Sequence, residues 1–284
     1  MYSKQKNRKA KAGLFLIASP RFKNLGEGLP HGTYGERKAM QVEEILGTLD
    51  FLDVIFPGIV YEREDAVRAM ERFYLEKADF IIAEFLSWSE DFAWIRFLRD
   101  MPEMPMIFVN VAKERMAFRD TLDEDDFIEY LCSGTLVGSL EGSGSLPRVG
   151  RKHVRIVMGS REEVTGRIRT FAAAARVRSL LRQSNLGLLA NYNEAMWSTY
   201  FDPYALFTKI GPEIHFLPYS TYGEVIDGVN DTVLNAYCDE LTARYRMMDD
   251  VDPEKFRASV RASIGLAEMA RMSDSDILVF NDID

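Results

Sequence analysis

Short apolar segments alternate with amphipathic segments from Gly13 onward, a pattern typical of α/β folds with parallel strands. Residues 14–18 are predicted to form a first buried strand. Residues 36–49 repeat apolar positions at helical spacing, which predicts the helix that follows. The same alternation predicts further strands at 53–60, 79–85 and 104–111, and helices at 63–77 and 89–99.

The composition changes at residues 133–145, which read SGTLVGSLEGSGS. Glycine and serine permit unusual backbone angles and offer little side-chain packing, so this segment is interpreted as a flexible connector. A domain boundary is therefore placed near Pro147. The expected domains are an N-terminal α/β domain at 1–147 and a central α/β domain at 148–284.

A second alternation begins after His153. Strands are predicted at 154–158, 186–190, 213–217 and 276–280, and helices at 161–182, 231–246 and 253–272. The last predicted strand is followed by only four residues, so the second domain is expected to be incomplete. The predicted fold class is two doubly wound, mostly parallel, Rossmann-like α/β domains.

Charge and composition narrow the class of protein. The net charge of −9 argues against non-specific nucleic-acid binding, which requires clustered cations. No stretch approaches the ~20 apolar residues of a membrane helix, and the apolar run after the basic residues 1–11 is too short for a signal peptide. Cys132 and Cys238 are expected to be reduced thiols, so the predicted location is cytoplasmic, with no nucleic-acid or membrane partner.

Motifs for common chemistries are not found in the sequence. The three histidines, His31, His153 and His215, are not spaced as metal ligands, and His153 and His215 are interpreted as structural or as surface residues. There is no HExxH or CxxC pattern, no phosphate loop and no GxSxG elbow. We therefore expect neither a metal site nor catalytic residues in this chain, and no cofactor bound by it.

The loop at residues 30–36, PHGTYGE, follows the first predicted strand and precedes a helix. Loops at the carboxyl ends of parallel strands bind ligands in open α/β sheets. His31, Thr33 and Tyr34 offer hydrogen-bonding groups and a ring face, which suit a polyhydroxylated ligand. Helix capping by Thr33 with Tyr34 as a packing anchor is an equal alternative.

Two further loops occupy comparable positions. Trp88 follows the third predicted strand and could stack on a sugar, or it could be ordinary core. Met196 lies in the segment 191–197, NYNEAMW, after a strand of the second domain. It could line a ligand site, although packing is the commoner role of such a residue.

These loops, in this order, resemble segments of the L-arabinose/L-fucose isomerase family. Residues 30–36 are similar to its Gln-His-x-Tyr-Gly-Glu segment, and residues 84–89, EFLSWS, to its Leu-His-Thr-Phe-Ser segment. Residues 191–196 resemble its Gly-Asp-Asn-Met stretch, and residues 220–225, STYGEV, its Asn-Thr-Tyr loop. The similarity is collinear over nearly the whole chain.

The resemblance implies the N-terminal and central α/β domains of an aldose–ketose isomerase, without the family's C-terminal β-rich domain. Family members bind Mn²⁺ or another divalent ion through ligands that lie beyond the end of this chain. The resemblance assigns a sugar pocket to His31, Thr33, Tyr34, Trp88 and Met196. It also implies a homo-oligomer, or a partner carrying the C-terminal domain, and no turnover by this chain alone.

Two other functions remain open at this point. A non-catalytic, two-lobed sugar-binding or regulatory protein would explain why the metal ligands are missing. A purely structural subunit would bind no ligand. Pentose or hexose binding distinguishes the first from the second.

Overall fold

The computed structural model describes residues 8–111, 123–189 and 196–280, and it divides the chain into two compact units. The first comprises Asn7–Val177, and the second is formed mainly by Arg178–Asp284. The boundary falls inside one long helix, α7 (Arg161–Leu181). Each unit is described below by itself.

The first unit is a Rossmann-like α/β unit built on a five-stranded parallel sheet in the order β2-β1-β3-β4-β5. The strands are β1 (Lys11–Ile17), β2 (Asp53–Ile55), β3 (Phe80–Phe85), β4 (Met106–Val111) and β5 (Val154–Gly159). The helices are η1 (Pro20–Phe22), α2 (Tyr34–Thr48), α3 (Arg63–Leu75), α4 (Asp91–Asp100), α5 (Glu124–Cys132), α6 (Thr135–Val149) and most of α7. Strand and helix thus alternate as the sequence pattern predicts, from the first strand to the fourth.

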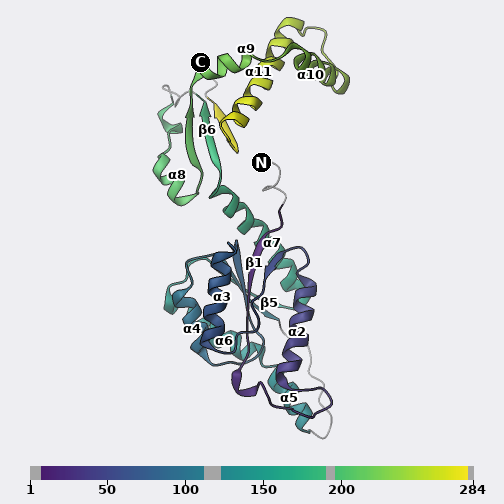
Figure 1. Cartoon of the computed structure of the whole chain (residues 1–284), viewed down its shortest axis with the longest axis vertical. Coiled ribbons are helices and arrows are strands. Elements are labelled where there is room, and N and C mark those ends of the chain that lie inside the picture. Colours follow the sequence, from purple (N-terminus) through teal and green to yellow (C-terminus); the bar gives the residue numbers. More distant parts are fainter. Residues whose placement is uncertain (1–7, 112–122, 190–195, 281–284) are drawn as a thin grey trace. The chain divides into compact units, whose positions relative to one another are not determined.

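Helices cover both faces of this sheet (Figure 1). One face packs against α2, α5 and α7, and the other against α3, α4 and α6. Side chains alternate between the faces, so that Leu14 and Leu16 point to the first and Phe15 and Ile17 to the second. Because both faces are covered, β1 and β3 are apolar at nearly every position.

The segment at residues 133–145 is not the predicted connector, because most of it lies in α6. Its glycines let the helix pack closely on the sheet. A Cβ at Gly142 would lie 2.7 Å from Cε2 of Phe85, and the Gly142 carbonyl accepts a 2.8 Å hydrogen bond from Trp94 Nε1. Tertiary packing therefore outweighs the poor helix propensity of glycine and serine here.

The position of β5 also differs from the prediction. The sequence pattern assigned this strand to the second domain, yet it pairs in parallel with β4 along its whole length. The two compact units consequently divide at Val177 and Arg178, and not near Pro147. The reason is that backbone pairing with β4 ties residues 154–159 to the first sheet.

The second unit contains a three-stranded parallel sheet in the order β7-β6-β8. Its strands are β6 (Asn185–Leu189), β7 (Glu213–Leu217) and β8 (Ile277–Phe280). Its helices are η2 (Trp197–Thr199), α8 (Pro203–Lys209), α9 (Tyr219–Asp227), α10 (Asp231–Arg244) and α11 (Pro253–Met272). The sequence pattern did not predict α8 or α9. Residues 220–225, which resemble the Asn-Thr-Tyr loop of the isomerase family, lie within α9.

Candidate functional site

The strand order of the first unit creates a switch point between β1 and β3. The chain leaves β1 toward β2 on one side, and β3 lies on the other side. Ligands of doubly wound sheets bind at such a point, outside the carboxyl ends of the strands. The loop that contains His31 and Thr33 and the loop that contains Trp88 both start from this edge, as the sequence predicts, whereas Tyr34 is already the first residue of α2.

Tyr34 lies beneath this edge as a packing anchor. Its side chain is fully buried, its hydroxyl contacts Ser87 Oγ, and it accepts a 3.3 Å hydrogen bond from Ser19 N. Burial raises the pKa of Tyr34, because a phenolate would lose its hydration there. The residue therefore links the loops after β1 and β3, and its ring is not exposed to a ligand.

Trp88 lies beside Tyr34 and is partly exposed. Phe22 joins the two rings, with its centroid 5.7 Å from that of Tyr34 and 5.9 Å from that of Trp88. The Arg21 guanidinium lies 6.0 Å from the Trp88 ring and forms a 2.6 Å ion pair with Glu90. The two predicted aromatic residues are thus brought together at the switch point.

Thr33 has a local role that the structure shows in full. Its hydroxyl accepts a hydrogen bond from Glu36 N, and its own N–H donates to the Glu36 carboxylate at 2.7 Å. This capping box starts α2 and lowers the pKa of Glu36, first through the backbone hydrogen bond of Thr33. The cap fixes the start of α2 at Tyr34, so that residues 34–36 of the segment predicted as a loop belong to the helix.

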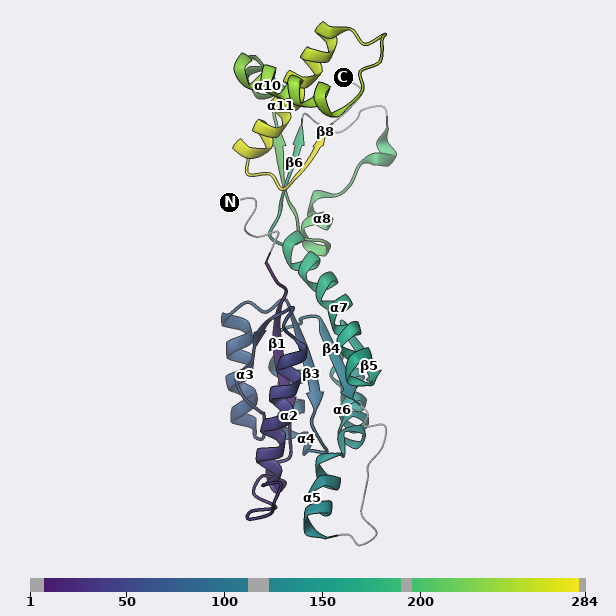
Figure 2. The ribbon, with the colours of Figure 1, turned by 90° about the vertical axis from the view of Figure 1, so that its right-hand side faces the viewer.

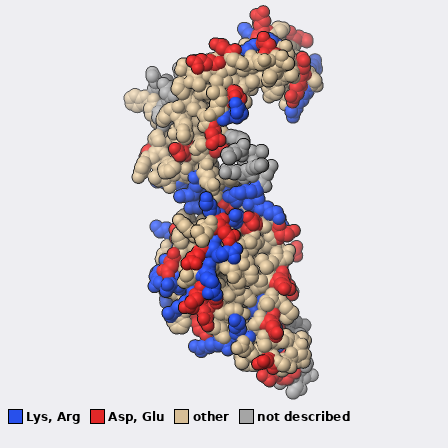
Figure 3. Space-filling view, in the orientation of Figure 1, with Lys and Arg blue, Asp and Glu red and all other residues tan. Residues whose placement is uncertain are grey.

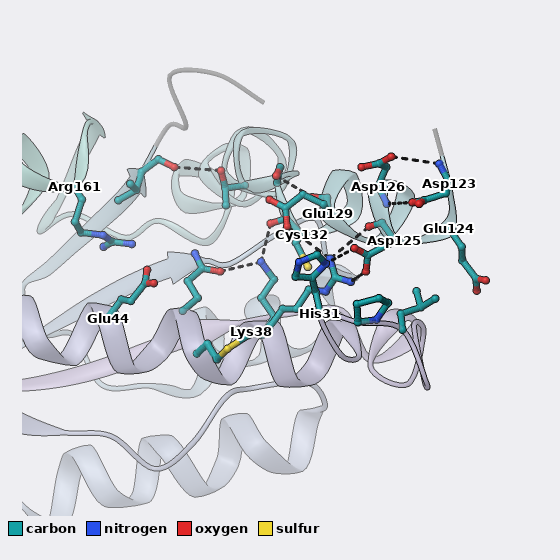
Figure 4. Close-up of a pocket in the computed structure, with 18 of the residues that line it drawn as sticks. His31, Lys38, Glu44, Asp123, Glu124, Asp125, Asp126, Glu129, Cys132 and Arg161 are labelled. Carbon is teal, nitrogen blue, oxygen red and sulfur yellow. Dashed lines mark hydrogen bonds and ion pairs between the residues drawn. The ribbon is translucent and has the colours of Figure 1, made fainter. Parts of the chain in front are cut away.

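A large cavity of about 1160 Å³ opens next to this loop, between α2 and α5 (Figure 4). His31 is the one predicted site residue among those that line it. Glu44 and Arg161 lie toward one end, and the acidic residues at the start of α5 lie toward the other. Apolar surface comes from Leu29, Pro30, Met40 and Val111.

His31 belongs to a three-residue cluster on the wall of this cavity. Its Nδ1 contacts one carboxylate oxygen of Asp125, and Arg37 donates to the other. Arg37 and Asp125 are buried, whereas the His31 side chain is 71% exposed. Since Nδ1 is occupied, the ring presents Nε2 outward.

The two neighbours also set the charge of Asp125. The hydrogen bond from His31, and then that from Arg37, lowers the pKa of Asp125 below its ordinary value. Arg37 is held in turn by the Gly32 carbonyl at 3.2 Å, so the cluster ties the 30–36 loop to α5. The carboxylate is therefore ionised and oriented at neutral pH.

Lys38 is a buried ammonium at the base of the cavity. Its Nζ donates to the Leu86 carbonyl at 2.5 Å, the Cys132 carbonyl at 2.7 Å and Gln41 Oε1 at 2.9 Å. These acceptors belong to the loop after β3, the end of α5 and α2 itself. A buried charge is tolerated when it is hydrogen-bonded in this way, and here it joins three elements of the site.

Arg161 closes the far end of the cavity at the start of α7. Its guanidinium makes a bidentate pair with the buried carboxylate of Glu84 on β3, at 2.8 and 3.1 Å. The pair explains a charged residue inside an otherwise apolar strand. The pair also neutralises the charge of Arg161, as Asp125 neutralises that of Arg37.

Sequence reasoning did not identify Arg37, Lys38, Asp125 or Arg161. Asp125 lies in the acidic run 123–126, which the sequence indicates as a helix start, and Asp123 does cap α5. Arg37 and Lys38 follow the PHGTYGE segment directly, and that adjacency is the one signal the sequence offers. Their partners become visible only when α5 is placed against α2.

Met196 belongs to the second unit, where it precedes η2 and is exposed. Residues 191–195 of the same segment lie outside the described residues. A sugar-binding role for His31, Thr33, Tyr34, Trp88 and Met196 stays a prediction, which the cavity supports most directly for His31.

Metal and membrane binding can be considered for the described ranges alone. There, no group of three or more histidine, cysteine or acidic side chains converges as metal ligands. Within the same ranges, no helix has the length and apolarity needed to cross a bilayer.

Comparison with known proteins adds no assignment to this geometry. No protein-family model matches the chain. No curated protein matches it in sequence.

Proposed function

We propose that the first unit binds a neutral sugar in the cavity between α2 and α5, with His31 as a direct contact. The observation that carries this proposal is the His31–Asp125–Arg37 cluster. It holds an exposed imidazole on the wall of a cavity beside the switch point of the sheet.

The charge of the lining supports a neutral ligand over a phosphorylated one. Six carboxylates and three cationic side chains line the cavity. Arg37 and Arg161 are already paired with carboxylates, and Lys38 donates to neutral oxygens. Added negative charge would therefore meet net repulsion. The six acidic residues are Glu44, Asp123, Glu124, Asp125, Asp126 and Glu129.

The chemistry of the wall also suits a polyhydroxylated molecule. Carboxylates and the Gln41 amide accept hydrogen bonds from hydroxyl groups, and the outer nitrogen of His31 can donate or accept. Met40 and Pro30 supply apolar surface for the C–H face of a sugar ring. Convergent polar groups on a partly apolar concavity are typical of small-molecule sites.

We propose further that this sugar site belongs to an aldose–ketose isomerase-like protein of cytoplasmic carbohydrate metabolism. The resemblance of residues 30–36 and 84–89 to the L-arabinose/L-fucose isomerase family supports this, since both segments start from the same sheet edge. In this proposal the divalent ion is held by a partner that carries the family's C-terminal domain. We therefore derive no catalytic step from the residues of this chain.

Titration calorimetry of the full chain with pentoses and hexoses tests the sugar site. We expect binding by the wild-type chain and about tenfold weaker binding by His31→Ala, because a hydrogen bond to a charge-assisted imidazole is lost. His153→Ala, which changes an exposed histidine of the same unit, should bind as the wild type does. Sugar phosphates should bind more weakly than the parent sugars.

Two results would contradict the proposal. One is the absence of saturable sugar binding, and the other is equal affinity for His31→Ala and His153→Ala. Sugar binding without interconversion, when Mn²⁺ and candidate partners are supplied and products are followed by NMR, would favour the non-catalytic sugar-binding protein.

A further inference from the structure

The outer strand of the first sheet, β5, exposes apolar side chains on one face. Ile156 is 55% exposed and Met158 is 65% exposed. Ile156 pairs with Phe108 of β4, and Met158 pairs with Asn110. All four side chains lie on the same face of the sheet, and α6 buries this face at Phe108. In a parallel sheet with two covered faces, such positions are normally buried.

The seating of α6 explains why this face of β5 is uncovered. Gly138 and Gly142 approach Phe85 on β3, and Ser139 accepts a 2.7 Å hydrogen bond from Asn110 on β4. The helix is therefore centred over β3 and β4. Its next face carries Leu136 and Leu140, which are also exposed and lie on the side toward β5.

β5 is also the last strand in the order β2-β1-β3-β4-β5 (Figure 2), so its outer edge has no strand partner among the described residues. The His153 carbonyl accepts from Met106 N on β4, so odd-numbered residues of this strand direct their N–H and C=O groups to β4. The N–H and C=O groups of Val154, Ile156 and Met158 therefore point away from β4, toward the open edge. Among the described residues no hydrogen bond takes them up.

The opposite edge strand of the sheet, β2, is too short to offer a comparable row of unpaired backbone groups. β2 spans only Asp53–Ile55, and short edge strands are one of the ways in which proteins limit edge pairing. β5 has six residues, no proline and no charge on its uncovered face. An edge with these features is a template for another strand.

We propose that β5 pairs antiparallel with β5 of a second copy of this chain, about a two-fold axis at Ile156. This register places Ile156 opposite its own copy and Val154 opposite Met158. All three are residues with outward backbone groups, so about six hydrogen bonds form between the strands. A symmetric interface of this kind is isologous, which makes it self-limiting as a dimer.

Charge supports the antiparallel arrangement. The exposed Lys152 precedes β5, and the exposed Glu162 follows it at the start of α7. Antiparallel pairing brings the basic end of one strand to the acidic end of the other. The register with Arg155 opposite its own copy would instead place like charges face to face, which destabilises strand pairing.

The first test is the mass of the full chain in solution, measured by sedimentation velocity over a range of concentrations. We expect a dimer for the wild type. Ile156→Lys should raise the dissociation constant by about 100-fold or more, because two ammonium groups would meet at the axis. Leu75→Lys changes an even more exposed apolar residue, on α3, and should leave the dimer intact.

A monomeric wild-type chain would overturn the proposal, and so would a dimer that persists in Ile156→Lys. Circular dichroism of both variants shows whether they are folded, which the exposure of Ile156 and Leu75 favours.

Single cysteines test the register independently. Cα atoms of a hydrogen-bonded antiparallel pair lie about 5.5 Å apart, within the roughly 4.4–6.8 Å that a disulfide spans. Ile156→Cys should therefore form a disulfide-linked dimer under mild oxidation, and Met158→Cys should not. The wild type, with its buried Cys132 and partly buried Cys238, gives the background. Equal cross-linking at both positions would refute the register.

Discussion

Replacing Gly138 with alanine adds one methyl group to the face of α6 that packs on β3. The new Cβ would lie 2.9 Å from Cδ1 of Phe85 and inside the contact distance of the Ser87 carbonyl oxygen. Because the carbonyl is backbone, it cannot move away as a flexible side chain could. Either α6 or the loop at Ser87 must therefore shift.

The magnitude follows from two opposed effects. An alanine in an open helical position is more favourable than glycine by about 1 kcal/mol. Overpacking a close contact costs about 1–3 kcal/mol, and contact with backbone favours the upper part of that range. We expect Gly138→Ala to lower the free energy of unfolding by about 1–2 kcal/mol.

Gly144→Ala is the matched control, since it lies on the same helix with no atom within 4 Å of its added Cβ. It should raise the free energy of unfolding by up to about 1 kcal/mol. Urea unfolding followed by tryptophan fluorescence measures both. Trp197→Phe, carried in every variant, confines the signal to Trp88 and Trp94 of the first unit.

Equal or greater stability of Gly138→Ala would refute the reasoning, because it would mean that the close approach of α6 to β3 is not required. Equal destabilisation by Gly144→Ala would refute it differently, by showing that glycine is needed along the whole helix rather than at the contact.

Three further predictions follow, two for Asp125 and Lys38 on the cavity wall and one for the buried Tyr34. The pKa of Asp125 is lowered, so its stabilising contribution is present above an unfolded value of about 4 and is lost as pH falls through the folded value. Asp125→Asn should flatten this acid-side loss in pH-dependent urea unfolding, and an unchanged profile would contradict it. Lys38→Met should cost roughly 2 kcal/mol or more, because it leaves the Leu86 and Cys132 carbonyls without their donor; a neutral effect in urea unfolding would argue against that account. Tyr34→Phe should cost about 1–2 kcal/mol through its lost hydroxyl contacts and leave sugar affinity unchanged in calorimetry. Loss of affinity without loss of stability would instead make Tyr34 a ligand contact.

The proposed dimer and the proposed sugar site are separable. The dimer rests on β5 and α6, and the sugar site on α2 and α5. Ile156→Lys should therefore leave sugar binding by the first unit intact, and His31→Ala should leave the dimer intact.

Figure 3 shows basic and acidic side chains interspersed over much of the visible surface of the first unit, with Asp and Glu at the α5 end.

Local pattern determined much of the first unit. The alternation of apolar and amphipathic segments predicts its first four strands and their helices. Helix capping by Thr33, one of the two alternatives that the sequence leaves open, is confirmed by the capping box with Glu36. The position of the 30–36 and 84–89 loops also follows, since parallel strands end at a common edge. The strand and helix assignments and the cap depend on residues that are close together in the chain.

Tertiary contacts decided the rest. From its composition, the glycine-rich segment 133–145 is predicted to be a connector. In the structure, Gly138 and Gly142 allow α6 to approach Phe85 closely, and the Gly142 carbonyl accepts a hydrogen bond from Trp94. The assignment of β5 depends on its pairing with β4, which the sequence pattern does not specify.

The same distinction divides the candidate site. The sequence by itself determined that His31 and Tyr34 follow a strand that ends at the carboxyl edge of a parallel sheet. Only the tertiary structure decided that Tyr34 is buried against Ser87 and that His31 meets Asp125 on a cavity wall. The physical reason is that periodicity reports which side of an element is apolar, whereas ion pairs and cavities arise between elements far apart in the chain.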